Sequence, residues 1–567
     1  MKQSFFFLAL LITLTGCASF GDGLWKSTEP AARSQQQDIL SSEPLTSSSA
    51  ANYLSAIHAN RANDFSAATG FIANLDDPGS TILTQKLILT VIDGNMASAF
   101  DQAGLLPEKG SDESLNHLIL AIRAIEAEEF AKAEEIYAKA SDQFSGAFIK
   151  PLITAWIKAG QGKKADSLAE IKKLENLEAL TPLQNLHTGL LYLYFEEALM
   201  AKPYLEEVLE TLKDANIRYV MLALDYYLRI YDLPKAQAVL EDVKAREPDS
   251  EFINYLEDKL NKGDPWISYS AKKGAAAAFY DVGTIFASER RPRQGLFYGQ
   301  LANYLDPTNP INPLFVANLF RQLQRFDESN RTYRQANLPD PFRFTAIFRQ
   351  AENLFFQEKF AEAAIELENL LSLYPDRSDV HVLLGDIYRN QKQYLQAAAE
   401  YGKAINLTAP HEPRHWTLFY ARGVAYERGG KWAKAEADLK QSIVLDPKQP
   451  TVLNYLGYSW IDMGINIEEG KDLILKAVEL SPSNGFIVDS YGWVLYTLKE
   501  YEQAALILEK AVRLEPSDAV IVDHYGDALW QTGRHQEAKF MWSQALSFNP
   551  ADDAKDKIIY KLQNGLQ

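Results

Sequence analysis

The chain has 567 residues, with 57 Lys and Arg against 75 Asp and Glu, and a formal net charge of −18. This acidic balance argues against binding to nucleic acid and against direct adhesion to anionic lipid, because both are themselves negatively charged. Cys17 is the single cysteine, so no intramolecular disulfide can form and packing must stabilise the fold. A plainer use of the acidic surplus is to keep a long chain soluble.

Residues 1–16 predict a signal peptide. One lysine precedes an apolar run from Phe5 to Leu14, which is too short to span a bilayer, and the chain then reads Leu-Thr-Gly-Cys up to Cys17. This pattern resembles bacterial lipoprotein precursors, in which cleavage precedes the cysteine and the cysteine carries the lipid. The resemblance implies lipidation of Cys17, and Ala18 after it implies an outer-membrane protein that faces the periplasm. The alternative is an ordinary secretory signal with an incidental cysteine.

Residues 17–49 contain the lipidated cysteine and are rich in Ser, Gln, Ala and Pro without periodicity, which predicts a flexible tether. For residues 50–265 we expect degenerate helical hairpins, because small residues such as Ala121, Ala133 and Ala140 keep a repeat spacing that recurs weakly downstream. The sequence Gly263-Asp264-Pro265 predicts a joint between this half and the next.

Residues 266–550 carry a regular ladder of small residues and prolines. The small residues are Gly283, Ala317, Ala351, Gly385, Gly423, Gly457, Gly492 and Gly526, with gaps of 34, 34, 34, 38, 34, 35 and 34. The prolines, each 24 or 25 residues later, are Pro307, Pro341, Pro375, Pro410, Pro447, Pro482, Pro516 and Pro550. Further small residues twelve positions after most ladder members predict that two helices cross closely there, and the proline ends the second helix.

This pattern resembles the tetratricopeptide (TPR) repeat, which has a period of 34 residues and a signature of Leu-Gly, an aromatic residue, alanines and a closing proline. Leu456-Gly457 and the stretch from Tyr491-Gly492 to Pro516 match that signature. The fold class implied is all-α, a TPR solenoid with eight regular repeats in residues 266–550. Residues 551–567 then read as the polar capping helix that the end of a solenoid requires.

No set of catalytic residues stands out in the sequence. His411-Glu-Pro-Arg-His415 formally matches the zinc motif H-E-x-x-H, which needs both histidines on one face of a continuous helix. Pro413 cannot lie inside an existing helix, so we expect His411 to precede the helix, in a surface loop. The sequence therefore predicts no metal, no cofactor and no enzymatic activity, with a zinc enzyme centred on this loop as the remaining alternative.

A partner-binding groove is implied by the TPR resemblance, because the first helix of each hairpin lines the inner face of such solenoids. The residues that the resemblance places there are Tyr420, Glu427, Asn454, Tyr458, Asp489, Trp493, Tyr496, Asp523, Asp527 and Trp530. Aromatic anchors flanked by polar groups suit peptide binding, although each aromatic could instead pack between neighbouring repeats. Asp489 and Asp523 stand where TPR domains that grip a carboxylate place a basic residue, so we expect a basic or apolar ligand.

The order of predicted lipid anchor, tether, weak hairpins and regular repeats resembles the lipoprotein adaptors of periplasmic carboxyl-terminal processing proteases. That resemblance implies protein partners, namely a periplasmic protease and the cell-wall hydrolases delivered to it, with membrane attachment through the lipid alone. The rival interpretation is an assembly factor for a secretin, pilus or polysaccharide export machine, whose partners would be export components. Neither interpretation involves nucleic acid.

Overall fold

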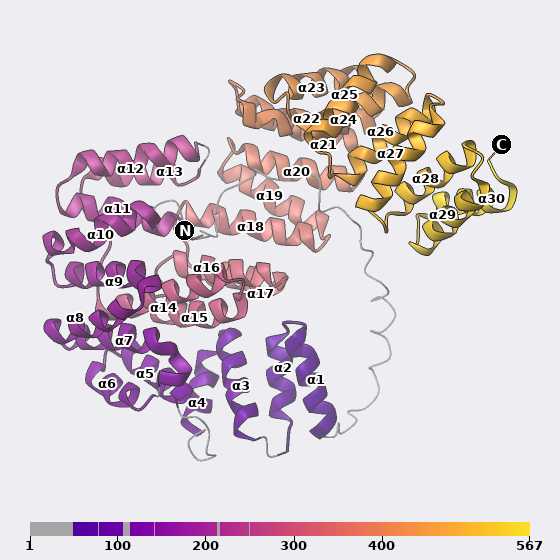
Figure 1. Cartoon of the computed structure of the whole chain (residues 1–567). Coiled ribbons are helices and arrows are strands. Elements are labelled where there is room, and N and C mark those ends of the chain that lie inside the picture. The colour runs from indigo at the N-terminus through magenta and orange to yellow at the C-terminus, as the bar shows by residue number, and fades with distance from the viewer. Residues whose placement is uncertain are drawn as a thin grey trace. The chain divides into compact units, whose positions relative to one another are not determined.

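The computed structural model describes residues 49–76, 79–105, 114–140, 142–212, 216–248 and 250–566. Within these ranges every regular element is a helix, which confirms the all-α prediction (Figure 1). The predicted signal peptide, Cys17 and the tether up to residue 48 lie outside the described residues. The described chain forms two compact units, which divide between Leu370 and Leu371.

The first unit contains most of the helices. They are α1 (Ser49–Arg61), α2 (Phe65–Ala73), α3 (Ser80–Ile92), α4 (Met96–Leu105), α5 (Ser114–Glu126), α6 (Phe130–Ala138), α7 (Asp142–Gly160), α8 (Lys164–Lys172), η2 (Lys173–Asn176), η3 (Glu178–Leu180), α9 (Thr181–Tyr194), α10 (Ala198–Leu212), α11 (Ile217–Arg229), α12 (Leu233–Arg246), α13 (Ile253–Lys262), α14 (Ala271–Ser288), α15 (Pro292–Leu305), α16 (Ile311–Gln322), α17 (Phe326–Gln335) and α18 (Phe342–Phe356). The next helix, α19 (Phe360–Leu373), contains the boundary between the units.

Most of these helices pair into hairpins, and each hairpin turn has a residue with positive φ. In the first unit the turn residues are Asn63, Gly94, Glu128, Gly162, Glu196 and Tyr231, followed after an interruption by Arg290, Gln324 and Glu358. From Asn63 to Tyr231, successive turn residues are 31, 34, 34, 34 and 35 positions apart. From Arg290 to Glu358 they are 34 positions apart. The period that is obvious in the later sequence therefore also sets the hairpins before residue 250, where the sequence shows it weakly.

The interruption in this series holds α13 and a short extended segment that leads into α14. Gly263 ends α13 in the left-handed conformation, with φ of 73°. The buried Asp225 carboxylate on α11 then accepts the backbone N–H groups of Trp266 and Ile267 at 2.7 and 2.8 Å, and the Tyr269 hydroxyl at 3.1 Å. One buried side chain thus satisfies the backbone of a segment that has no helical hydrogen bonds of its own.

The sequence Gly263-Asp264-Pro265, proposed as a joint, lies inside the first compact unit. The compact units divide about a hundred residues later, within α19. A boundary between compact units does not show where regular repeats begin. The division into degenerate repeats up to residue 265 and regular repeats after it therefore stays a prediction.

Asp281 on α14 is a buried node that joins this helix to three earlier hairpins. Its carboxylate accepts hydrogen bonds from the Tyr219 hydroxyl at 2.8 Å and from the Arg218 guanidinium, both on α11. His187 Nε2 on α9 lies 3.1 Å from the same carboxylate, while His187 Nδ1 accepts the indole N–H of Trp156 on α7 at 3.1 Å. Since Nδ1 accepts, the ring proton lies on Nε2 and points toward Asp281.

The charge on this node is balanced inside the unit. Burial would raise the pKa of Asp281, but the Arg218 charge and the His187 hydrogen bond hold that pKa below its usual range. Burial and the Asp281 charge also raise the pKa of Tyr219 well above its ordinary value, so its hydroxyl stays a donor. The node is therefore an ion pair with satisfied hydrogen bonds rather than an isolated buried charge.

Helices α14 and α15 fill the concave side of the earlier hairpins. In Figure 1, α14 lies beside α7 and α9, on which it packs, while α15 packs on α3 and α5. Gly274 of α14 lies against the Trp156 ring, where any Cβ would collide. The Gln300 amide of α15 donates to the Ile92 carbonyl at 3.0 Å. The first unit thus uses its inner surface for its own core.

The second unit continues the hairpins to the end of the described chain. Its elements are α20 (Ser378–Asn390), α21 (Tyr394–Leu407), η4 (Pro413–His415), α22 (Trp416–Arg428), α23 (Trp432–Leu445), α24 (Pro450–Asp462), α25 (Ile467–Leu480), α26 (Gly485–Thr497), α27 (Tyr501–Leu514), α28 (Ala519–Gln531), α29 (His535–Ser547) and α30 (Asp552–Asn564). The ladder glycines lie where the helices of one hairpin cross: a Cβ on Gly457 would lie 2.6 Å from the Gly470 carbonyl oxygen, and one on Gly492 would lie 2.6 Å from the buried Leu508 side chain.

The Asp281 node predicts a large loss of stability when its carboxylate is removed. Asp281→Ala leaves Arg218 buried without a counter-ion, and we expect the free energy of unfolding of the first unit to fall by about 3–5 kcal/mol. Urea unfolding followed by circular dichroism measures this change. Glu129→Gln, which breaks the exposed 2.7 Å pair with Lys132, is the control and should change stability by less than about 1 kcal/mol. Equal effects of the two variants would contradict the assigned role of the node.

The crossing at Gly457 predicts opposite signs for two glycine substitutions. Gly402→Ala in α21 meets no atom closer than 3.5 Å, so its helix propensity should stabilise the second unit by up to about 1 kcal/mol. Gly457→Ala places a methyl group against the Gly470 backbone, and overpacking should outweigh that gain and destabilise the unit by about 1–3 kcal/mol. Thermal unfolding of both variants measures the difference, and a stabilising Gly457→Ala would refute the close crossing.

Candidate functional site

The ten residues proposed for the groove lie on four successive first helices of the second unit. They are Tyr420 and Glu427 on α22, Asn454 and Tyr458 on α24, Asp489, Trp493 and Tyr496 on α26, and Asp523, Asp527 and Trp530 on α28. Asp489 and Asp527 are buried, and the other eight are partly exposed. The structure brings these residues into three groups, which differ in what they contact.

The group on α22 and α24 is used in packing between neighbouring hairpins. The Tyr420 ring meets the Tyr455 ring edge to face at 5.7 Å, and the Tyr455 hydroxyl donates to Glu427 at 2.9 Å. The Asn454 amide donates to the Ser490 hydroxyl of α26 at 3.2 Å. These contacts fix the spacing of α22, α24 and α26, so for this group interhelical packing accounts for much of the predicted pattern.

The second group, which we call the Trp493 cluster, consists of Asp489, Trp493, Tyr496 and His524. The Trp493 ring stacks on Tyr496 at 4.7 Å and on His524 at 3.9 Å. His524 Nδ1 lies 3.1 Å from both carboxylate oxygens of Asp489. His524 is not among the residues predicted for the groove, although its position 35 residues after Asp489 places it at almost the same point of the next repeat.

Electrostatics favour the charged form of this histidine. Burial would lower the pKa of His524, but the Asp489 carboxylate raises it above its ordinary value through both its charge and its hydrogen bond. Asp523 and Asp527 on the same helix add to this effect. The Trp493 cluster is thus a partly exposed aromatic surface beside a histidine that gains a proton more readily than usual.

The third group, which we call the Lys561 clamp, joins α28 to α30. It consists of Asp523, Asp527, Trp530, Trp542 and Lys561. Lys561 Nζ lies 2.8 and 2.9 Å from the two Asp523 oxygens and 2.7 and 2.8 Å from those of Asp527. The Trp542 indole donates to Asp527 at 2.8 Å. Burial and the Asp523 charge raise the pKa of Asp527 to about 6, although Lys561 opposes the shift.

Trp530 is covered by the residues that follow α30. Its indole N–H donates to the Leu566 carbonyl at 3.2 Å, and its ring lies against Gly565, where a Cβ would collide. It also contacts His535 at 4.2 Å and Trp542 at 5.3 Å between ring centroids. The part of the predicted groove on α28 is therefore occupied by the chain's own C-terminal segment.

The three helices α24, α26 and α28 carry more acidic than basic side chains, and His524 is their basic residue. They carry Asp462, Asp489, Asp523 and Asp527 and contain neither lysine nor arginine. Partly exposed aromatic side chains, among them Tyr458 and Trp493, lie between these carboxylates along the helices. Three of these aspartates already face cationic groups of the chain, Asp489 at His524 and Asp523 and Asp527 at Lys561, so the surface is one that holds cations beside aromatic rings.

The His411 motif is not continuous with a helix. His411 lies in the segment before η4, as Pro413 predicts, and His415 Nδ1 accepts the backbone N–H of Glu412 at 2.9 Å. Over the described ranges, no three His, Cys, Asp or Glu side chains meet closely enough to hold a metal ion. None of the helices in those ranges combines the length and apolar content needed to cross a membrane.

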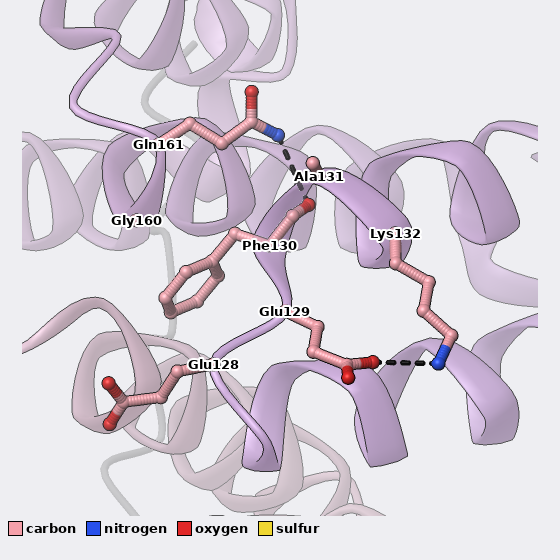
Figure 2. A pocket seen from close by; sticks show the side chains of 7 residues that line it. All are labelled: Glu128, Glu129, Phe130, Ala131, Lys132, Gly160 and Gln161. Carbon is pink, nitrogen blue, oxygen red and sulfur yellow. Dashed lines mark hydrogen bonds and ion pairs between the residues drawn. The ribbon is translucent and has the colours of Figure 1, made fainter.

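A surface hollow in the first unit lies between the start of α6 and the end of α7 (Figure 2). The Phe130 ring fills the space over Gly160, and the Gln161 amide donates to the Phe130 carbonyl at 3.1 Å. Glu129 pairs with Lys132 on its rim. Glu128 pairs with Lys272 of α14 at 3.8 Å, so the charged side chains around the hollow already have partners and the hollow is a product of hairpin packing.

Comparisons with known proteins identify the repeats. A tetratricopeptide-repeat family model matches residues 377–549. A TPR repeat-containing protein of Pseudomonas aeruginosa is 31% identical over 152 residues, which are 27% of this chain and 25% of that protein. Anaphase-promoting complex subunit 3 of Schizosaccharomyces pombe is 26% identical over 130 residues, which are 23% of this chain and 20% of that subunit. The matches thus span a quarter or less of these curated relatives.

Solved structures with TPR hairpins resemble the chain at low sequence identity. The Cut9–Hcn1 hetero-tetramer of the anaphase-promoting complex matches with a TM-score of 0.38 and 13% identity, over 92% of this chain and 97% of that one. A tetratricopeptide repeat protein of Parabacteroides merdae matches with a TM-score of 0.38 and 14% identity, over 45% of this chain and all of that one.

The raised pKa of His524 predicts a pH dependence of stability. Its ion pair with Asp489 contributes fully below about pH 6.5, the ordinary histidine value, and is lost as pH rises through the higher pKa of the folded state. We therefore expect the free energy of unfolding of the second unit to fall between pH 6 and pH 8, by at most about 1.4 kcal/mol per pH unit. His524→Gln should flatten this dependence. Denaturant unfolding at both pH values tests the prediction, and equal slopes for the two proteins would contradict it.

Proposed function

Because a TPR family model matches residues 377–549 and the described residues form an all-α array of hairpins, we propose that the chain is a non-enzymatic scaffold, held at the periplasmic face of the outer membrane by lipid on Cys17. In this proposal it is an adaptor that brings cell-wall hydrolases to a periplasmic carboxyl-terminal processing protease. The predicted lipid anchor, the tether and the long array of hairpins support the proposal.

The observation that carries the binding proposal is the charge of α24, α26 and α28. Asp489 faces His524, and Asp523 and Asp527 hold the ammonium group of Lys561, so the carboxylates of these helices select cations. Beside the stacked rings of Trp493 and Tyr496 they favour a partner segment that carries positive charge. An aromatic surface of this kind buries area at low entropy cost, and a cation over the Trp493 ring would gain further attraction. We propose that the partner binds here through a cationic segment.

The packing of the first unit also favours a partner site on the second unit. Its concave side is filled by α14 and α15, and the contacts of Trp156 with Gly274 and of Asp281 with Arg218 leave these helices buried. A partner segment that entered this side would have to displace part of the core. We therefore place the partner on the second unit.

Capture from cells tests the proposal. Full-length tagged chain, its Trp493→Ala variant and its Phe540→Ala variant are recovered from detergent-solubilised membranes, and co-purified proteins are quantified by mass spectrometry. Phe540 on α29 is 65% exposed and lies outside the predicted groove, so it is a matched aromatic control. We expect Trp493→Ala to reduce partner recovery about tenfold or more and Phe540→Ala to leave it unchanged.

The proteins recovered decide between the two interpretations. A periplasmic protease together with cell-wall hydrolases would support the adaptor, while export components would contradict it in favour of an assembly factor. Undiminished recovery by a folded Trp493→Ala variant would refute the binding face.

A further inference from the structure

We infer that α30 occupies the α28 end of the binding face as an internal ligand, and that a partner helix bearing a lysine takes its place in the Lys561 clamp. This inference rests on the proposed function. It names the chemistry of the partner, a helical segment with one lysine that points to the two carboxylates and an apolar residue beside it.

The contacts of Lys561 are those of a receptor for an ammonium group. All four oxygens of Asp523 and Asp527 lie within 2.9 Å of Nζ, and the three side chains are between 6% and 17% exposed. The ammonium also lies over the Trp542 ring at 5.9 Å. Two carboxylates so close together need a cation, because their mutual repulsion is not screened by bulk water.

Apolar contacts hold α30 less extensively than the helices before it. Ile558 is its fully buried hydrophobic side chain, Ile559 and Leu562 are partly buried, and Tyr560 is 51% exposed. In contrast, α28 buries five hydrophobic side chains, namely Ile521, Val522, Tyr525, Ala528 and Leu529. The attachment of α30 therefore depends strongly on the Lys561 clamp, which another lysine can satisfy equally well.

The clamp belongs to the same surface as the proposed binding site. Asp523 and Asp527 follow Asp489 along consecutive first helices, and the Tyr496 hydroxyl has its pKa raised by burial and then by Asp527, so the Trp493 cluster and the clamp share one electrostatic field. A capping helix needs an apolar contact and a polar outer side, but it does not need a lysine buried between two aspartates. The cationic partner proposed above would fit between Asp523 and Asp527 in place of Lys561.

A peptide that copies the chain's own residues 551–567 tests the inference without any partner protein. The peptide is labelled with a fluorophore and titrated, by anisotropy, with the full chain and with its Lys561→Gln and Lys557→Gln variants. Lys557 is exposed on the same helix, so its substitution removes the same charge one turn away. We expect Lys561→Gln to bind the peptide at least tenfold more tightly than the wild type or Lys557→Gln.

Two further measurements make the outcome decisive. A peptide with glutamine in place of Lys561 should lose the gain, and hydrogen exchange of residues 552–566 should be faster in Lys561→Gln alone. If exchange accelerates but peptide binding does not increase, the inference is overturned. A wild-type dimer whose copies exchange α30 would also overturn it, because the occupant would then be a second copy.

Different results would refute this inference and the proposed function. If α30 competes with the partner, Lys561→Gln should increase partner recovery several-fold in the capture experiment. Unchanged recovery by Lys561→Gln, with the loss caused by Trp493→Ala intact, would refute displacement of α30 and leave the scaffold proposal standing. Absence of any partner would refute the scaffold proposal. The peptide titration would then still decide whether α30 can be displaced, because it needs no partner protein.

Discussion

The buried ion pair between Asp281 and Arg218 is the interaction on which the architecture depends most. A charge in the interior is tolerated when its partners are complete, and here His187, Tyr219 and both guanidinium contacts complete it. The requirement fixes α14 against α9 and α11, the first helices of two earlier hairpins, through residues that lie 62 to 94 positions away along the chain. A repeat array, which normally has contacts only between neighbours, thereby acquires a long-range core.

This constraint gives the two units different surfaces. Helices of the first unit that would line a groove instead contact α14 and α15, so their polar groups serve the fold. In the described part of the second unit, residues 371–566, the corresponding helices meet no inserted helix. Tyr458, Trp493 and Tyr496 remain partly exposed there, while Asp489 is buried against His524 and α30 covers the residues of α28. The same repeat geometry thus closes the inner side of the first unit and leaves side chains of the second unit partly exposed.

The sequence predicted the fold better than it predicted the site. The ladder from Gly283 to Gly526 is readable because close helix crossings need small residues, as the approach of Gly457 to Gly470 shows. The earlier hairpins are harder to read because Leu87 and Leu224 stand where the ladder has a glycine or alanine, seven residues before the left-handed turn residue. The partners His524 and Lys561 come from the next helix in space, and the Asp281 node joins distant segments. Periodicity assigns a residue to a face but does not say which side chain meets it there.

A photo-crosslinking comparison tests most directly whether partners bind the second unit. The photoreactive amino acid p-benzoylphenylalanine replaces Tyr496 in the Trp493 cluster in one variant and Tyr231, which is 91% exposed in the first unit, in another. Both are irradiated in the cells that produce the chain. A covalent partner adduct from position 496 and none from position 231 is the predicted result. An adduct from position 231 with none from position 496 would contradict the assignment of binding to the second unit.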